Sequence, residues 1–304
     1  MRDFSPRPWQ PAMMEHIHRL PRCGLWAGMG TGKTSAVLTS IDAMLMAGAL
    51  RKPVLVVAPL RVAQSTWPDE AAKWRQLRHL EVVPMTGSPA SRAAHLANAR
   101  NGRAPIYTIN YDNLPWLMEH MDGGSFPFSM VVADESTRLK SFRLGGGKGR
   151  RARALAAVAH KHCERWVNLT GTPSPNGLAD LWGQTWFLDA GERLGRSFTA
   201  FQNRWFRQTV RPGAPGPLVP LPHAQAEIEA RLADLHLTVD AADWLPVDEP
   251  IYVRVPVRLP AKARAAYKEL ESRLIADVQG ETITAVTAAA LSIKCVKIGR
   301  ASCR

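Results

Sequence analysis

The chain has 304 residues, of which 46% are hydrophobic and 21% are charged, a balance typical of folded globular proteins rather than disordered chains. No stretch approaches the roughly 18 apolar residues of a membrane-spanning helix, and the first residues lack the apolar core of a signal peptide. The four cysteines form no CxxC pair and have no histidine at metal-ligand spacing, so neither a disulfide scaffold nor a zinc site is indicated. These features predict a cytoplasmic protein.

The formal net charge of +13 and the isoelectric point of about 10.1 predict attraction to a polyanion, and nucleic acid is the natural partner. Arginine predominates over lysine among the basic residues, which a GC-rich genome produces without any selection for binding. A nucleic-acid-binding face is the preferred interpretation, and biased composition is the alternative.

Short apolar runs alternate with helix-like stretches from the amino terminus onward. Helices are predicted over residues 33–47, ended by Gly48, over 63–74, and after Ser88 and Pro89. Continuously apolar, β-branched runs are typical of parallel strands that are buried on both faces. Such strands are predicted at residues 23–27, 53–59, 80–85, 105–110, 128–134 and 165–171. The fold class is therefore α/β, with a mainly parallel sheet.

The pattern changes after Leu188. An arginine- and aromatic-rich helical stretch leads to a proline-rich segment at 210–224, an extended segment at 249–259 and a long helix from Lys262 to about Val278. We expect a first domain over residues 1–188 and a mostly helical, proline-rich extension over 189–296.

The stretch from Ala27 to Thr34 reads AGMGTGKT and follows a predicted strand. It matches the phosphate-binding template G-x-x-x-x-G-K-[ST], with alanine in place of the first glycine. In such a loop the backbone N–H groups surround the phosphates, Lys33 reaches the β- and γ-phosphates, and the Thr34 hydroxyl ligates Mg²⁺. The nucleotide-binding residues predicted here are Gly28, Met29, Gly30, Thr31, Gly32, Lys33 and Thr34.

Asp134 and Glu135 follow the predicted strand at 128–134. A carboxylate at this position can hold a magnesium ion across adjacent strand ends, and a second carboxylate can orient and deprotonate an attacking water. We assign the metal role to Asp134 and the base role to Glu135.

Thr170, Gly171 and Thr172 follow the next strand in a Thr-Gly-Thr-Pro turn, where hydroxyl groups can sense the γ-phosphate. The ordered set AGMGTGKT, VVAPLRVAQSTWPDEAAKW, INYDNL, DESTRLK and LTGTPSPN resembles the RecA-like first motor lobe of superfamily-two helicases. It is most similar to the Swi/Snf-related DNA-dependent ATPases. The resemblance covers roughly residues 4–188 and continues more weakly, toward helicase-like phage proteins, beyond them.

The resemblance implies ATP and Mg²⁺ as ligands, duplex DNA as partner, and a bacterial or phage-infected cell as the setting. It implies that Gln10 recognises adenine, although packing at the surface is the alternative from chemistry alone. Contacts to the DNA backbone are implied for Pro59, Leu60, Arg61, Thr86, Gly87, Asn110 and Tyr111, where ordinary turns are the alternative. Ser136 and Thr137 depart from the Ala-His of the family's DEAH-type box, so no coupling role is assigned to a histidine.

Basic residues surround three glycines at 145–147. Arg150 and Arg151 are predicted to contact DNA together with the neighbouring basic residues, and a merely solvated loop is the alternative. The neighbours are Lys140, Arg143, Lys148 and Arg153.

In motors of this family the second lobe supplies an arginine finger, and no such lobe is recognised in this sequence. The last eight residues, KIGRASCR, are what a common sequencing adaptor encodes in one frame. We therefore expect residues 297–304 to be an artefactual tail and the natural protein to be longer. Three functions stay open: a DNA-dependent ATPase that translocates on or remodels DNA, an ATP-binding module without useful turnover, and the ATPase part of a restriction or defence complex.

Overall fold

The computed structural model describes residues 2–121, 126–144, 149–211 and 214–240, together with 243, 253, 260, 261, 264, 265, 267–269, 275–278 and 281–284. The chain divides into two compact units, Met1–Val247 and Asp248–Arg304, and each is described by itself. Within the described residues, no helix combines the length and the apolar character required to cross a membrane.

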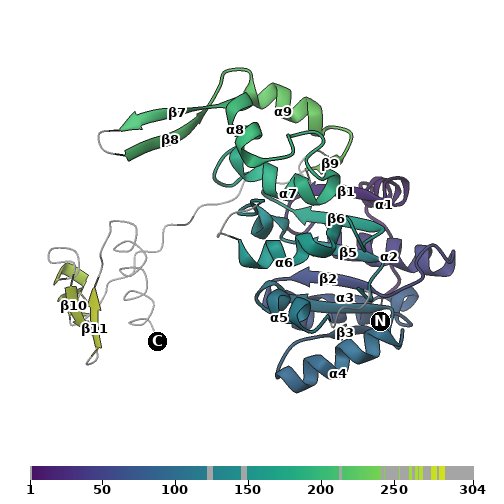
Figure 1. Cartoon of the computed structure of the whole chain (residues 1–304). Helices are drawn as coiled ribbons and strands as arrows, with labels where there is room; N and C mark the ends of the chain where they lie inside the picture. The colour runs from purple at the N-terminus through teal and green to yellow at the C-terminus, as the bar shows by residue number, and fades with distance from the viewer. Residues whose placement is uncertain are drawn as a thin grey trace. The chain divides into compact units, whose positions relative to one another are not determined.

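A parallel sheet of seven strands organises the first unit (Figure 1). Its strand order is β3-β4-β2-β5-β6-β1-β9, and every neighbouring pair is parallel. The strands are β1 (Arg22–Ala27), β2 (Val54–Ala58), β3 (Val82–Pro84), β4 (Ile106–Asn110), β5 (Met130–Asp134), β6 (Arg165–Thr170) and β9 (His236–Val239). The predicted α/β class and the mainly parallel sheet are confirmed.

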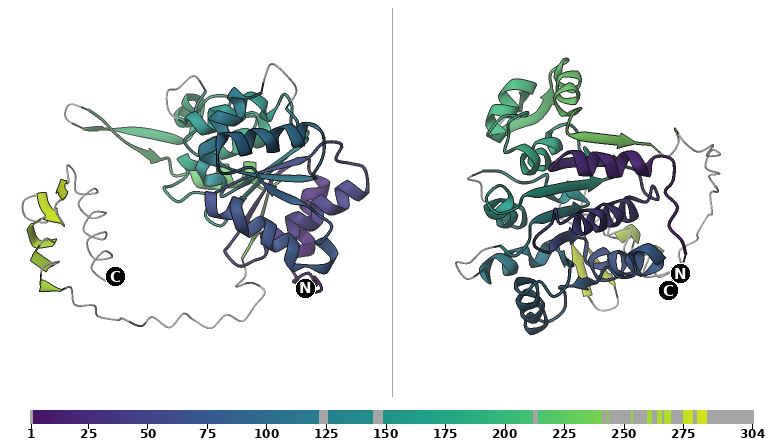
Figure 2. Two further views of the ribbon diagram at one scale, coloured as in Figure 1. Left: turned by 90° about the horizontal axis from the view of Figure 1, so that it is seen from below. Right: turned by 90° about the vertical axis from the view of Figure 1, so that its right-hand side faces the viewer.

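Helices cover both faces of the sheet (Figure 2), and the strand side chains alternate between two cores. On β2, Val54 and Val56 face one core, whereas Leu55 and Val57 face the other. The first core includes side chains of α1 (Gln10–Arg19), α2 (Lys33–Met46) and α3 (Trp67–Lys73). The second includes side chains of α4 (Pro89–Arg100), α5 (Leu114–Glu119), α6 (Arg150–Ala159) and α7 (Ala179–Asp189).

Local signals in the sequence set several helix ends. The Ser88 hydroxyl accepts a hydrogen bond from the N–H of Ser91 and so caps α4, with Pro89 in its first turn. Gly48 has a φ of 67° and follows the C-cap of α2, as predicted. Short helical turns complete this part of the chain: η2 (Arg75–Leu77), η3 (Tyr111–Asn113) and η4 (Ser136–Leu139).

The helix predicted over residues 63–74 is divided in two. A π-helical turn, η1 (Val62–Thr66), precedes α3. Pro68 lacks the N–H that a regular helix needs there, which favours such an irregularity. The Trp67 N–H donates to the Val62 carbonyl, five residues back, and the Ala63 carbonyl accepts a hydrogen bond from the Thr108 hydroxyl at 2.5 Å, which attaches the irregular turn to β4.

The chain beyond Leu188 differs from the predicted helical extension. After α8 (Phe198–Trp205) it forms an antiparallel hairpin of β7 (Phe206–Arg211) and β8 (Ala214–Pro220), then α9 (Ala224–Leu232). The proline-rich segment therefore contains a strand, and Figure 1 shows the hairpin projecting from the sheet. A Cβ on Gly216 would lie 2.3 Å from the Thr209 carbonyl oxygen, so a glycine is needed where β8 approaches the backbone of β7 this closely. The expected boundary at Leu188 falls inside the first compact unit, since β9 adds an edge strand to the sheet.

In the second unit, β10 (Ile275–Val278) pairs with β11 (Glu281–Thr284). The described residues between 261 and 269 are helical, but the predicted helix to Val278 is wrong at its end, because residues 275–278 form a strand. β-Branched residues cluster at Val278, Thr282, Ile283 and Thr284 and favour a strand. The predicted extended segment at 249–259, apart from Val253, and the tail at 297–304 lie outside the described residues.

Candidate functional site

The predicted phosphate-binding loop connects β1 to α2 at the carboxyl edge of the sheet. Gly30 and Gly32 have φ angles of 77° and 79°, in the left-handed region that glycine adopts most readily. A Cβ on Gly32 would also lie 2.4 Å from Nε2 of Gln10. Inside the loop, the buried Thr31 hydroxyl donates to the Gly28 carbonyl at 2.8 Å, and Met29 is exposed at the tip. The loop thus turns tightly before the first N–H groups of α2, a geometry suited to an anion.

Lys33, the first residue of α2, folds back over this loop. Its ammonium donates to the carbonyl oxygens of Ala27 at 2.6 Å and Gly28 at 2.8 Å. Burial lowers the pKa of Lys33, and the nearby carboxylates of Asp134 and Glu135 act against that shift. The lysine is therefore a partly desolvated cation held by neutral acceptors, which is an environment that favours an incoming anion.

Asp134 ends β5 at the same edge. One carboxylate oxygen accepts a hydrogen bond from Nε1 of Trp67 at 2.9 Å, and the other accepts from the N–H of Glu135 at 3.0 Å. Burial raises the pKa of Asp134, whereas the Trp67 hydrogen bond and the Lys33 charge lower it. The carboxylate is thereby fixed in orientation and lies within electrostatic range of the loop lysine.

Glu135 has φ 54° and ψ 55°, a left-handed conformation that is uncommon outside glycine. Tyr111 stabilises this turn, because its hydroxyl donates to the Asp134 carbonyl at 2.8 Å and lies 3.4 Å from that of Glu135. An unusual backbone conformation held by a buried neighbour is typical of functional sites. The turn aims Glu135 away from the direction that a continuing strand would give it.

β6 lies between the two motifs in the sheet. The sequence argument placed the loop strand and the carboxylate strand next to each other, and this was wrong: β1 and β5 each pair with β6 instead. The intervening strand brings the turn at Thr170–Thr172 into the middle of the site. A Cβ on Gly171 would lie 3.3 Å from the Ala27 carbonyl oxygen, and the N–H of Thr172 donates to the Thr170 hydroxyl at 3.1 Å.

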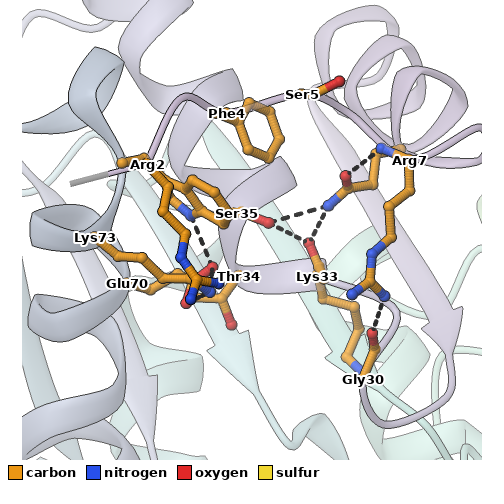
Figure 3. Close-up of a pocket in the computed structure, with 13 residues that line it drawn as sticks. Arg2, Phe4, Ser5, Arg7, Gly30, Lys33, Thr34, Ser35, Glu70 and Lys73 are labelled. Atoms are coloured by element: carbon orange, nitrogen blue, oxygen red, sulfur yellow. Dashed lines mark hydrogen bonds and ion pairs between the residues drawn. The ribbon is translucent and has the colours of Figure 1, made fainter.

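The segment before α1 packs against the other side of the loop (Figure 3). Arg7 donates to the Gly30 carbonyl at 2.6 Å, and Trp9 Nε1 donates to the Thr31 carbonyl at 2.8 Å. Gln10 is only 2% exposed, and its amide nitrogen donates to the Gly32 carbonyl and the Ser35 hydroxyl. Its amide oxygen accepts from the Arg7 N–H at 2.8 Å. Gln10 therefore stabilises the conformation of the loop. The resemblance implied adenine recognition by Gln10 and not this structural role.

A pocket of about 390 Å³ opens beside this segment. Its lining combines the start of α2 with the aromatic rings of Phe4 and Trp74, whose centroids are 5.2 Å apart. The other lining residues are Arg2, Ser5, Arg7, Gln10, Gly30, Gly32, Lys33, Thr34, Ser35, Glu70 and Lys73. A flat apolar group next to a phosphate chain fits such a lining.

The residues present fit a magnesium ion that arrives with a nucleotide. Among the described residues, no group of three or more His, Cys, Asp or Glu side chains is placed to hold a metal. Mg²⁺ commonly uses one or two carboxylates, a hydroxyl and substrate phosphates, so it does not need such a cluster. Thr34, the second residue of α2, and the fixed Asp134 carboxylate are the residues that would hold it.

The predicted DNA-contact residues follow other strand ends at the same edge of the sheet. Pro59, Leu60 and Arg61 come after β2, where Leu60 and Arg61 are exposed, and Thr86 and Gly87 come after β3. Asn110 is buried, and its side-chain oxygen accepts from Nδ2 of Asn113 at 2.6 Å. Tyr111 does not fit its predicted role, because it is 1% exposed and its hydroxyl is bound to the carboxylate turn.

The basic cluster is largely engaged by the protein itself. Lys140 pairs with Asp180 at 3.0 Å, and Arg143 donates to the Lys140 carbonyl at 2.8 Å while packing over the Phe198 ring. Arg150 and Arg151 are exposed and pair with Glu119 at 3.4 Å and Asp112 at 2.5 Å. Lys148 lies outside the described residues. Arg150 and Arg151 are thus accessible cations, each with a carboxylate beside it, and Arg153 is exposed as well.

Sequence reasoning missed Trp67, the hydroxyl of Tyr111 and the side chain of Gln184. All three contact the carboxylate turn from distant parts of the chain. Trp67 and Gln184 carry no motif signal of their own, and Tyr111 was assigned to DNA contact instead, so only the sheet topology brings these three side chains to the site.

Comparison with known proteins identifies the family. The SNF2-related domain family matches residues 13–244. Protein p41 of Acyrthosiphon pisum secondary endosymbiont phage 1 is 52% identical over 299 residues, covering 98% of this chain and 64% of p41. The transcription regulatory protein SNF2 of Saccharomyces cerevisiae is 28% identical over 154 residues, covering 51% of this chain and 8% of SNF2.

The fold comparison agrees. The Sulfolobus solfataricus SWI2/SNF2 ATPase core, solved in complex with dsDNA, matches with a TM-score of 0.61 at 20% identity, covering 98% of this chain and 58% of that one. The chain therefore spans less than two thirds of the length of these relatives. The match over residues 13–244, a range that includes the loop, carboxylate and threonine turns described above, shows that this chain belongs to the SNF2-related domain family.

Proposed function

We propose that the chain is the ATP-binding, amino-terminal motor lobe of a Swi/Snf-like DNA-dependent ATPase. The observation that carries this proposal is the position of Lys33, a partly buried cation within electrostatic range of Asp134 and Glu135 and bound only to loop carbonyls. A triphosphate would give the lysine an anionic partner. The bound metal would offset the negative charge of the phosphates and the two carboxylates.

The geometry supports the following roles. Lys33 and the N–H groups of the loop bind the phosphate chain, and Thr34 and Asp134 hold Mg²⁺, which supplies charge neutralisation when bound. Glu135, turned out of the strand direction, orients the attacking water and accepts its proton at the carboxylate. The turn at Thr170–Thr172, packed against Ala27, responds to the presence or loss of the γ-phosphate.

The pocket beside Phe4 and Arg7 takes the adenine base. Both N–H donors of the Gln10 amide are bound in this structure, so adenine recognition by Gln10 requires its oxygen to accept a second hydrogen bond or its contacts to change. Its bonds to Gly32 and Ser35 also let it transmit base binding to the loop.

Duplex DNA is the proposed partner, supported by the net charge of +13 and by the similar SWI2/SNF2 ATPase core that was solved in complex with dsDNA. We expect the second motor lobe in the full-length protein to supply the arginine finger. The phage origin of p41 favours the cytoplasm of a bacterial or phage-infected cell as its location.

The two other functions are distinguished by experiment. An ATP-binding module without useful turnover would bind nucleotide but show no DNA-stimulated hydrolysis. A role in a restriction or defence complex would be indicated by nuclease genes beside this one.

Isothermal titration calorimetry of ATP with Mg²⁺ tests the proposal directly. Lys33→Ala is expected to weaken binding at least tenfold, because the phosphates lose their cation. Lys161→Ala, an exposed lysine after α6, is the matched control and should leave affinity unchanged. Equal affinity of Lys33→Ala and the unsubstituted chain would show that the loop does not bind phosphate.

A further inference from the structure

Ser136, the residue after Glu135, is buried and reaches across to α7. It is 1% exposed, and its hydroxyl donates to Oε1 of Gln184 at 2.9 Å. Ser136 stands where the resembling DEAH-type box has alanine, which has no hydroxyl to donate. The contact therefore belongs to a departure of this sequence from that motif.

The Gln184 amide, itself 4% exposed, makes two further contacts. Its nitrogen donates to the Pro173 carbonyl at 2.7 Å and to the Asp180 carbonyl at 3.0 Å. Because two carbonyl acceptors surround one end of the amide, that end is the nitrogen, and the oxygen faces the serine hydroxyl. Pro173 follows Thr172 directly, so one side chain joins the carboxylate turn to the threonine turn.

The backbone around Gln184 is held firmly in place. The Gln184 carbonyl accepts from Nδ2 of Asn168 on β6 at 3.0 Å. A Cβ on Gly183 would lie 2.7 Å from the carbonyl oxygens of both Leu139 and Lys140, so α7 touches the end of η4 backbone to backbone. The position of Gln184 is thus set by the sheet and by η4 together.

A continuous series of contacts follows from this arrangement. Gly171 packs on the Ala27 carbonyl of the phosphate loop, Pro173 is bonded to Gln184, and Gln184 is bonded to Ser136 beside Glu135. The series passes through the side chain of Gln184, whose hydrogen bonds go to Ser136, Pro173 and Asp180 and not to the loop or to Glu135.

We propose that Gln184 is a positioning residue that couples the threonine turn to the carboxylate turn, so that nucleotide bound at the loop orders both turns together. The proposal rests on the proposed function, since it assumes that ATP binds at this loop. Breaking the Ser136 or Pro173 bond should leave nucleotide binding intact and disconnect the two turns.

Amide hydrogen exchange of the 304-residue chain, with and without ATP and Mg²⁺, tests this coupling. In the unsubstituted chain, nucleotide should slow exchange both in a loop peptide spanning residues 28–36 and in a turn peptide spanning 171–178. In Ser136→Ala and in Gln184→Met, the loop peptide should keep its protection and the nucleotide-induced slowing of the turn peptide should fall at least threefold.

Ser129→Ala is the matched control. It also removes a buried serine hydroxyl bond, to the Lys52 carbonyl at 2.9 Å, but just before β5 at the opposite edge of the sheet. It should behave like the unsubstituted chain in both peptides. A merely structural role of Gln184 would change exchange equally with and without nucleotide, and that result would overturn the coupling.

Two outcomes separate the inference from the function on which it rests. If the loop peptide is protected and the turn peptide responds equally in all variants, the coupling is wrong while nucleotide binding stands. If nucleotide protects neither peptide in the unsubstituted chain, the proposed function fails and the coupling fails with it. Ser136→Ala, the smaller change, decides the matter if Gln184→Met does not fold.

Discussion

At the scale of single residues, Glu135 combines a proposed chemical role with an unfavourable backbone conformation. A non-glycine residue in the left-handed region costs roughly 1–3 kcal/mol, and the Tyr111 hydroxyl bond to Asp134 helps to hold it there. A glycine would therefore be more stable at this position, but it would lack the carboxylate that the proposed chemistry needs.

Replacing Glu135 separates the two effects. The free energy of unfolding of Glu135→Gly should be higher than that of Glu135→Ala by roughly 1 kcal/mol, because glycine adopts φ 54° without steric cost. Urea unfolding followed by circular dichroism measures the difference. Equal stability of the two variants would show that the conformation is unstrained.

At the scale of elements, most of the sheet was predictable because its central strands are continuous apolar runs. The proposed phosphate loop and the carboxylate pair could be recognised as motifs because their residues are contiguous in sequence, and both lie at the carboxyl edge of the sheet. The strand order was not, since nothing local in β6 places it between β1 and β5. β9 escaped detection because it is four residues long and begins with His236, and the hairpin of β7 and β8 escaped because its prolines resemble a loop.

The docking of β9 depends on a glycine in β1. A Cβ on Gly24 would lie 2.2 Å from Cδ2 of His236, whose ring also packs on Trp26 with centroids 4.3 Å apart. Gly24→Ala should destabilise the chain by roughly 1–3 kcal/mol in thermal or urea unfolding. Adding His236→Ala should restore part of that stability, because it removes the atoms that the new methyl group meets. If the double variant is no more stable than Gly24→Ala, the clash lies elsewhere.

The same histidine makes β9 sensitive to acid. Burial lowers the pKa of His236 from 6.5 to about 4, a shift equivalent to roughly 3 kcal/mol. The unfolded chain therefore binds a proton at a higher pH than the folded chain, so stability is complete above pH 6.5 and decreases as the pH falls toward 4. Unfolding free energies measured across this range should show that slope, and His236→Phe should reduce it. A slope unchanged by His236→Phe would assign the acid sensitivity to other groups, such as His16, whose pKa burial also lowers.

At the scale of the whole molecule, the net charge of +13 matters only where cations are accessible. Arg150 and Arg151 are exposed, but each forms an ion pair, Arg150 with Glu119 and Arg151 with Asp112. Exposed ion pairs of this kind are weak, so a phosphate can displace the carboxylates at little cost.

Salt-dependent DNA binding tests this surface. Replacing Arg150 and Arg151 by Gln should flatten the plot of log affinity against log salt by roughly 0.9 for each DNA phosphate that is no longer neutralised. Replacing Glu119 and Asp112 by Gln and Asn should instead raise affinity at low salt, because the arginines lose their competitors. The double change Arg51→Gln and Arg78→Gln, at exposed positions elsewhere, is the charge-matched control. An equal effect of both arginine pairs would assign the binding to net charge rather than to this site.

Under the proposed function, turnover requires a second motor lobe. In this proposal Glu135, Asp134 and Lys33 would assemble the nucleotide and the water, but an arginine finger contributes on the order of 10³–10⁵ to the rate in phosphate-cleaving enzymes. We expect the 304-residue chain to bind ATP and to hydrolyse it very slowly, with little stimulation by DNA. The full-length protein should show DNA-stimulated hydrolysis, and Glu135→Gln should abolish it while ATP binding survives. Steady-state phosphate release, measured with and without duplex DNA, provides the comparison. Rapid DNA-dependent turnover by the 304-residue chain alone would contradict the two-lobe mechanism, and a rate that rises with the square of protein concentration would then point to a finger supplied by a second copy.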